Sequence, residues 1–212
     1  MIGDLITRDV RRGTTGTAWL PAAFFLLIVA LMPFAVGPDA RLLGRIGGGV
    51  LWIAALTAAL QPIERLIEPD RADGMLDQLF LHGIADESVA AAKVFAHWLT
   101  FGPLLLIAAV PGAALMAMDG AALLRGEIAL AVGTPGLAAL AVAIAAVTAG
   151  LPRAGALAGL LLVPLAIPLL IFGAAASSGG HAAALPLEAA ISLLLTAGAP
   201  FVAGAAIRAS RT

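Results

Sequence analysis

The sequence predicts an all-α integral membrane protein with six membrane-spanning helices. Hydrophobic residues make up 61% of the 212 residues and charged residues only 12%, about half of the roughly 25% charge that is typical of a soluble domain. The apolar residues fall into six runs, each close to the roughly 20 residues that a helix needs to cross a hydrocarbon core. Of the five connections between these runs, only the second is long, and it has an amphipathic pattern of its own.

The first 14 residues are expected to form an amphipathic helix on the membrane surface. Ile2, Leu5, Ile6 and Val10 recur at helical spacing, and charged residues cover the rest of the helix. Acidic residues already stand in the first turns, which is unlike the start of a cleaved signal peptide. We therefore expect this segment to be retained.

The six spans are expected to form one membrane domain that covers residues 1–212. Proline lies in or at the edge of every span and bends a helix by removing a backbone donor. The predicted spans run from Ala18 to Val36, Ile46 to Ile63, Val94 to Met118, Ile128 to Gly150, Gly155 to Ala176, and Leu187 to Ile207.

The distribution of basic residues predicts that both termini are cytoplasmic. Lys and Arg are retained on the cytoplasmic side of a membrane. With the N-terminus inside, Arg41, Arg45 and Arg125 fall outside. The nine that fall inside are Arg8, Arg11, Arg12, Arg65, Arg71, Lys93, Arg153, Arg208 and Arg211.

The long connection, residues 64–93, is predicted to be a cytoplasmic coupling segment. It carries seven acidic residues against three basic ones. We expect Asp73 to cap an amphipathic helix that stops at Gly83, and Asp86 to cap the next helix, which continues into the third span. The apolar face of the amphipathic helix would consist of Met75, Leu76, Leu79 and Phe80.

Such a helix, tied to a span at both ends, could act as a lever. Its apolar face could lie on lipid or in a groove of a cytoplasmic partner. Helices that bind anionic lipid usually carry basic residues on the polar face, whereas this one carries acids, which favours a protein partner. The residues expected to contact that partner are Glu64, Asp70, Asp73, Gly74, Met75, Leu76, Asp77, Leu79 and Phe80.

The composition argues against several kinds of chemistry. Without cysteine there is no disulfide, thiolate metal site or covalent haem attachment. A P-loop needs a lysine after its glycines, but the only lysine, Lys93, follows three alanines. The net charge of −1 offers no basic field for nucleic acid. We therefore expect a subunit that is not an enzyme and that depends on a separate ATPase for ATP-driven work.

The sequence resembles known proteins at two levels, first in the coupling segment and then along nearly the whole chain. The run ERLIEPDRADGMLDQLFLHG, followed by AAKVFAHWLTFGPLL, resembles the cytoplasmic connection of ABC-2-type permeases. More closely, the chain resembles the haem exporter protein B family (CcmB) of cytochrome c maturation. The resemblance rests on LMPFAVGPDARLLGRI, VLWIAAL, ERLIEPDRADGMLDQL, KVFAHW, GTPGLA and LVPLAIPLLIFG, in this order along nearly the whole chain.

The resemblance implies a permease of the bacterial inner membrane that works in a larger complex. Its partners would be an ABC ATPase subunit that binds ATP, a haem-handling membrane subunit, a small membrane subunit and a haem chaperone, with a homodimer also possible. Haem would be cargo of the complex, for export or for release of the loaded chaperone. An alternative is an ABC-2-type exporter of another apolar substrate.

Three histidines are candidates for an axial haem ligand. His181 lies in the expected external loop and is the best placed, although a lone loop histidine is a weak signal. His82 lies in the cytoplasmic turn. His97, near the start of the third span, is expected to donate to a backbone carbonyl or to lie at the membrane interface with Trp98. We expect this chain itself to bind no cofactor, so haem binding would belong to a partner.

Two functions from other classes remain as alternatives. A secondary transporter would usually place a carboxylate near the middle of the membrane, whereas the acids here are expected at the ends of the spans, with Glu188 at the start of the last one. A structural assembly factor would tolerate changes in the coupling segment. Co-purification with an ATPase separates an ABC permease from both.

Overall fold

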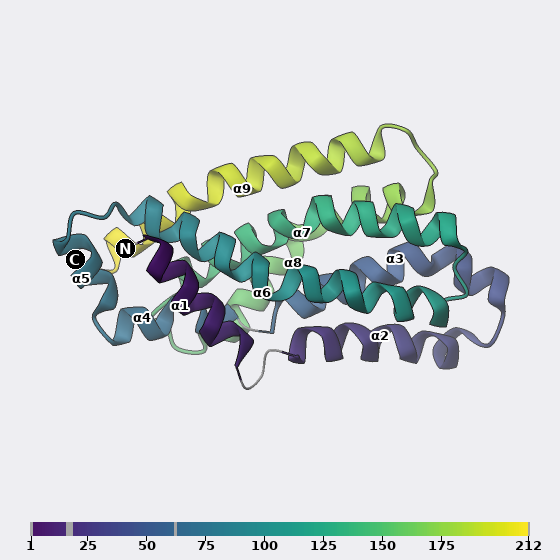
Figure 1. Cartoon of the computed structure of the whole chain (residues 1–212), viewed down its shortest axis with the longest axis horizontal. Helices are drawn as coiled ribbons and strands as arrows, with labels where there is room; N and C mark the ends of the chain where they lie inside the picture. The colour runs from purple at the N-terminus through teal and green to yellow at the C-terminus, as the bar shows by residue number, and fades with distance from the viewer. Residues whose placement is uncertain (1, 16–18, 62, 212) are drawn as a thin grey trace.

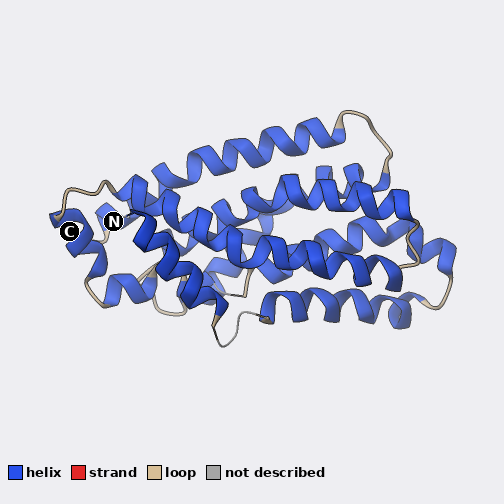
Figure 2. Cartoon of the chain, in the orientation of Figure 1, coloured by secondary structure: helices blue, strands red, loops and turns tan. Residues whose placement is uncertain are grey.

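The computed structural model describes residues 2–15, 19–61 and 63–211, and every regular element among them is a helix (Figure 2). This confirms the predicted fold class. The elements are α1 Ile2–Thr14, α2 Leu20–Val36, α3 Ala40–Ala59, the 3₁₀ turn η1 Ile63–Arg65, α4 Glu68–Ala72, α5 Met75–Leu81, α6 Asp86–Leu115, α7 Gly120–Thr148, α8 Ala154–Ser178 and α9 Ala184–Ala209.

The long helices run side by side in an elongated bundle (Figure 1). The expected spans fall on α2, α3 and α6 to α9, although α3 ends at Ala59 rather than Ile63, and Ala18 is outside the described residues. In the described part of the chain, five helices are long and apolar enough to cross a membrane. They begin at Ala40, Asp86, Gly120, Ala154 and Ala184, while α2 is apolar but has 17 residues. The chain is therefore a multi-pass membrane protein.

Helix α7 is the centre of the bundle. It packs against α3, α6, α8 and α9, and its apolar stretch is the most buried of the candidate spans. Residues 137–146, LAALAVAIAA, are all buried. Since small side chains let the backbones of membrane helices approach closely, this alanine-rich stretch can be covered on all sides.

The indole of Trp52 fills a slot between three helices. Trp52 lies on α3 and is 1% exposed, and its ring lies against Gly133 of α7 and Gly173 of α8. A Cβ atom on either glycine would collide with the ring. The two glycines therefore set how closely α7 and α8 approach α3.

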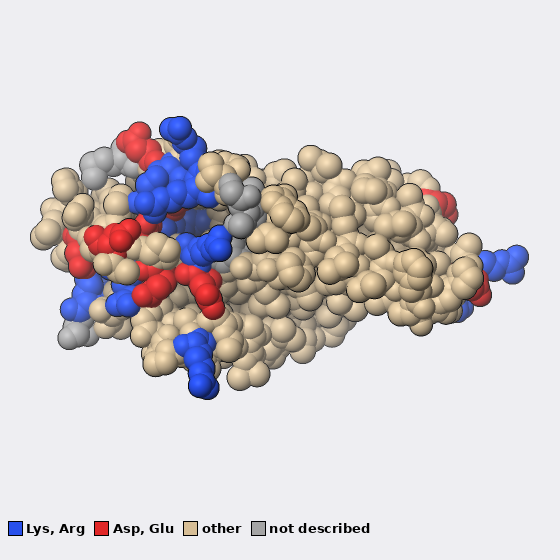
Figure 3. Space-filling model, turned by 90° about the horizontal axis from the view of Figure 1, so that it is seen from below, with Lys and Arg blue, Asp and Glu red and all other residues tan. Residues whose placement is uncertain are grey.

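On the face seen in Figure 3, the side chains of Lys, Arg, Asp and Glu gather at the two ends of the bundle, and the surface between the ends shows none of them. The end with most of the charge holds α4 and α5, the start of α1 and the end of α9 (Figure 1). At the opposite end, Asp39 caps α3 by accepting hydrogen bonds from the backbone N–H groups of Arg41 and Leu42. This separation of polar ends from an apolar middle fits a bundle that crosses a bilayer.

Candidate functional site

The connection between α3 and α6 forms two short helices, α4 and α5, rather than one. Pro69 lies in the first turn of α4, and Gly74 adopts a left-handed conformation (φ +70°) that separates the two helices. The prediction that Asp73 caps the amphipathic helix is wrong. The N-cap of α5 is Gly74, no side chain bonds to its first amides, and Asp73 instead ends α4.

The predicted stop at Gly83 is confirmed. Gly83 follows α5 with φ +77°, and its N–H donates to the carbonyl of Phe80 at 2.8 Å. The N–H of Ile84 donates to the carbonyl of Leu79 at 3.1 Å. These paired bonds form a Schellman motif, which a glycine with positive φ favours.

The prediction that Asp86 caps the next helix is wrong. Ala85 is the N-cap of α6, and the carboxylate of Asp86 does not bond to the helix amides. It accepts instead from both terminal nitrogens of the Arg211 guanidinium, at 2.7 and 2.8 Å. A bidentate pair of this kind is stronger and more directional than a cap bond.

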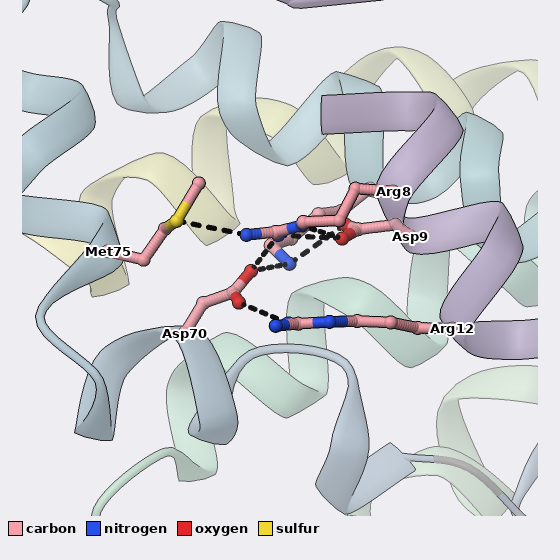
Figure 4. A network of polar contacts seen from close by, with 6 residues as sticks. Arg8, Asp9, Arg12, Asp70 and Met75 are labelled. Atoms are coloured by element: carbon pink, nitrogen blue, oxygen red, sulfur yellow. Dashed lines mark hydrogen bonds and ion pairs between the residues drawn. The ribbon is translucent and has the colours of Figure 1, made fainter. Parts of the chain in front are cut away.

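Asp70 is the centre of an ion-pair network that joins three helices (Figure 4). From α1, Arg8 contacts one carboxylate oxygen at 2.6 Å and Arg12 contacts the other at 3.0 Å. From α6, Lys93 contacts Asp70 at 2.5 Å. Lys93 and Arg8 both also contact Asp9, so the network fixes α1 against the coupling segment.

Burial makes this network energetically important. The side chains of Asp70 and Lys93 are each 4% exposed. Burial acts to raise the pKa of Asp70, but the ion pairs with Lys93 and Arg8 outweigh it, and the pKa lies below its usual value. A lowered carboxyl pKa stabilises the fold at and above the usual carboxyl pKa, and this contribution is lost as pH falls through the lowered value.

Arg211, just beyond α9, clamps α5 to the start of α6. Besides Asp86, it donates to Asp77 at 3.0 Å and to the backbone carbonyl of Leu76 at 3.0 Å. Its guanidinium also lies over the ring of Phe80, 4.7 Å from the centroid. The hydrogen bond with Asp86 raises the pKa of Arg211, so the clamp is charged at any physiological pH.

Further polar contacts of two glutamates, Glu87 and Glu68, hold the coupling segment in place. Arg208 of α9 pairs with Glu87 of α6. Glu68 of α4 accepts from Arg71 at 2.7 Å and from the backbone N–H of Gly150 at 2.7 Å. The segment is thus tied to the connection between α7 and α8 as well as to both ends of the chain.

The residues predicted to contact a partner fall into three groups, which are buried, half-buried and exposed in the folded chain. Asp70, Leu76 and Leu79 are buried within the chain. Gly74 and Met75 are half-buried, and the sulfur of Met75 accepts from Arg8 at 3.0 Å. The residues that remain on the surface are Glu64, Asp73, Asp77 and Phe80.

Two apolar side chains at the end of α5 stand out of the folded chain. Phe80 is 54% exposed and Leu81 is 82% exposed. Leu81 was missed by the sequence analysis, although its place just before the helix stop could have suggested it. We call Phe80 and Leu81 the α5 tip.

The three histidines lie in different environments. His181 is exposed in the connection between α8 and α9, and His82 is exposed with its Nδ1 2.7 Å from the carbonyl oxygen of Gln78. His97 is buried and stacks on Phe101 with ring centroids 4.8 Å apart. Within the described ranges, no three His, Cys, Asp or Glu side chains group as metal ligands, and haem ligation by His181 stays a prediction.

The sequence matches the CcmB protein family over residues 1–210. The chain belongs to the CcmB family. Among its relatives, heme exporter protein B of Paracoccus denitrificans is 43% identical over 212 residues, and the match covers 96% of this chain and 97% of that protein.

Two other relatives of this CcmB family member match it with similar identity and coverage. Heme exporter protein B of Rhodobacter capsulatus is 42% identical, with 96% of this chain and 97% of that protein covered. Heme exporter protein B of Escherichia coli K12 is 40% identical, with 90% and 89% covered. The resemblance stated from the sequence motifs is thus confirmed at the level of the family.

In this CcmB family member, the partners of the acidic residues were not predicted from the sequence. Of the seven acidic residues in the coupling segment, Asp70, Asp77 and Asp86 are paired with arginines from α1 or from beyond α9. The one available signal was that basic residues cluster in both terminal segments. A cytoplasmic location for all these residues places them together, but it does not give the pairing.

Proposed function

We propose that the chain is the membrane subunit of a haem-export system for cytochrome c maturation, driven by a separate ABC ATPase. Membership of the CcmB family carries this proposal, because the relatives are named heme exporter protein B. The lack of a P-loop lysine supports an ATPase on another chain and a role for this one that is not catalytic. Haem is cargo of the complex in this proposal.

The proposed setting is the bacterial inner membrane, crossed six times with both termini in the cytoplasm. The sixth crossing is α2, whose 17 apolar residues reach about 26 Å, close to the thickness of a hydrocarbon core. The gathering of basic residues with α4 and α5 at one end supports the cytoplasmic assignment of that end (Figure 3).

The ATPase is proposed to bind the α5 tip and the acids around it. Phe80 and Leu81 offer an apolar anchor, and Asp73 and Asp77 lie on the exposed side of the same segment. An apolar anchor ringed by polar groups is typical of an interface hot spot. Motion of the ATPase would reach the bundle through the Asp70 network and the Arg211 clamp.

The other proposed partners follow from the family. They are the haem-handling membrane subunit, the small membrane subunit and the haem chaperone of the same system. Helices α8 and α9 carry large exposed apolar side chains, Leu160, Leu193, Leu194 and Phe201 among them. These faces meet lipid, a membrane partner or a second copy of the chain.

Co-purification of the tagged chain with its ATPase tests the α5 tip. The double variant Phe80→Asp, Leu81→Asp should lose the ATPase because charges replace the apolar anchor. Leu151→Asp is the matched control, since Leu151 is a 48% exposed leucine in the connection between α7 and α8, outside the tip. Equal recovery of the ATPase by the double variant and the control removes the tip from the interface.

The alternative function is an ABC-2-type exporter of another apolar substrate, which the exposed apolar faces alone would also fit. The optical spectrum of the purified complex, with and without the haem chaperone, separates the two. A haem-free complex that binds the ATPase but never the chaperone favours the alternative.

A further inference from the structure

Glu188 is a buried carboxyl group without a partner. It lies on α9, its side chain is 0% exposed, and neither carboxyl oxygen makes a hydrogen bond to the residues that the structure describes. The sequence places Glu188 at the start of the last span, and the structure confirms this, since α9 begins at Ala184. The sequence did not indicate that the neighbours of Glu188 enclose it.

The carboxyl lies near the middle of the bundle rather than at its end. It packs against Gly133, which is 13 residues into the 29-residue α7, or about 20 Å from the start of that helix. One turn further along α9, Ser192 accepts a hydrogen bond from the N–H of Gly136 at 3.0 Å. In Figure 1, α9 begins well short of the end at which α3 begins, which brings its first turns level with the middle of α7.

The carboxyl is closely packed on the side that faces α7. A Cβ atom on Gly133 would lie 2.5 Å from the carboxyl oxygen Oε1 and would also collide with the ring of Trp52. The indole N–H of Trp52 is itself buried without an acceptor. A proton can bind to such a carboxyl without further space.

The charged groups on the helices that pack against Glu188 lie elsewhere along those helices. Helix α8 contains no Asp, Glu, Lys or Arg. On α7, Arg125 and Glu127 precede Gly133 by about two turns. The remaining charged or titratable residues are Arg41 and Arg45 in the first turns of α3, Asp86, Glu87, Lys93 and His97 in the first half of α6, and Arg208 at the far end of α9.

An ionised carboxylate at this position would be costly. A charge buried without a partner loses its hydration and gains nothing in return, and the cost is highest in the middle of a membrane. We propose that Glu188 is a proton-binding site of the bundle, protonated when α7 and α9 are packed as here and able to release its proton to water when they separate.

The local structure of α7 provides a place for that separation. Pro135 has no N–H, so the carbonyl of Ala131 lacks its helical donor, and the N–H of Gly136 bonds to Ser192 of α9. Prolines of this kind are where helices bend. Bending of α7 at Pro135 would change the access of water to Glu188. By linkage, protonation of Glu188 would then shift the equilibrium between the packed and the separated arrangement of α7 and α9.

This proposal goes beyond the proposed function because it needs neither haem nor an ATPase. Infrared spectroscopy of the full chain in lipid tests it, since a protonated carboxyl and a carboxylate differ in their carbonyl stretch. At neutral pH, the wild type should show a protonated-carboxyl band that shifts with isotope-labelled glutamate. Glu188→Gln should lose this band entirely.

Glu127→Gln is the matched control, because Glu127 on α7 also has a buried carboxyl oxygen without a partner. It should keep the Glu188 band. The proposal is overturned if the wild type shows no such band, or if the band disappears in Glu127→Gln and survives in Glu188→Gln.

Thermal unfolding gives a second readout. A carboxyl that is protonated only when folded contributes stability that is lost as pH rises. The melting temperature of the wild type should therefore fall more steeply toward alkaline pH than that of Glu188→Gln. Parallel profiles for the two proteins would contradict the proposal.

Discussion

Asp70 is the residue at which α1, the coupling segment and α6 meet, and its side chain is almost fully buried from water. Forming a buried ion pair gives little net stability, because desolvation offsets the attraction. Removing one side chain of such a pair costs far more stability, because the charge of the other side chain stays buried without its partner. Lys93, 4% exposed, is that charge here, and without Asp70 it keeps only the longer contact with Asp9, at 3.1 Å.

Asp70→Asn should destabilise the protein by about 3–5 kcal/mol and release α1. The amide cannot balance Lys93, Arg8 and Arg12 together. Limited proteolysis within residues 2–14 and the thermal midpoint in detergent measure the effect. Asp73→Asn serves as control because Asp73 is exposed in the same segment. If the two variants melt and are cleaved alike, the network does not anchor α1.

Gly173→Ala should also destabilise the bundle, by about 1–3 kcal/mol, as expected for overpacking in a close-packed core. The added methyl group would collide with the buried ring of Trp52. The thermal midpoint measures the change. Gly49→Ala is the control on the helix of Trp52, since a Cβ there meets nothing within 4 Å. A midpoint for Gly173→Ala equal to that of the control would show that the slot can widen freely.

At the scale of elements, α5 is too short to be stable alone. Its seven residues are well below the roughly 12–15 that an isolated helix needs in water, so tertiary contacts must hold it. The Schellman motif ends it, and the contacts of Arg211 with Asp86, Asp77 and Phe80 fix its position.

Arg211→Ala should therefore loosen α5. Losing a charged, bidentate hydrogen bond costs about 1.5–3 kcal/mol, which corresponds to amide hydrogen exchange in α5 that is faster by about tenfold or more. Exchange mass spectrometry of peptides over residues 75–81 measures this. Arg208→Ala removes a neighbouring pair that does not touch α5 and should leave these peptides unchanged. Protection of α5 that survives Arg211→Ala would place the support elsewhere.

Hydrophobic run length was enough to predict the helices that form the bundle, because a span needs about 20 apolar residues whatever its neighbours are. It could not give the helix ends. Helix α3 ends at Ala59 rather than Ile63, and the N-caps of α5 and α6 are Gly74 and Ala85 rather than Asp73 and Asp86. A carboxylate with an arginine in reach forms the ion pair in place of the cap.

At the scale of the whole molecule, both ends of the chain hold the coupling segment. Arg8 meets Asp70 across 62 residues and Arg211 meets Asp86 across 125. Such pairings depend on how the helices pack, which one sequence without its structure does not give. The depth of Glu188 was missed for the same reason, since it depends on where α9 starts relative to α7.

The six-span arrangement makes a prediction that cysteine labelling can check directly, because the chain has no cysteine of its own. Single variants Thr14→Cys, Ala85→Cys and Ala182→Cys place one thiol at exposed positions. In intact cells, a membrane-impermeant maleimide should label only Ala182→Cys, since the proposed arrangement places the other two positions in the cytoplasm. All three should react after permeabilisation, which controls for reactivity. Labelling of Thr14→Cys in intact cells while Ala85→Cys stays protected would mean that α2 does not cross the membrane. Labelling of Ala85→Cys would put the coupling segment on the wrong side for any cytoplasmic ATPase.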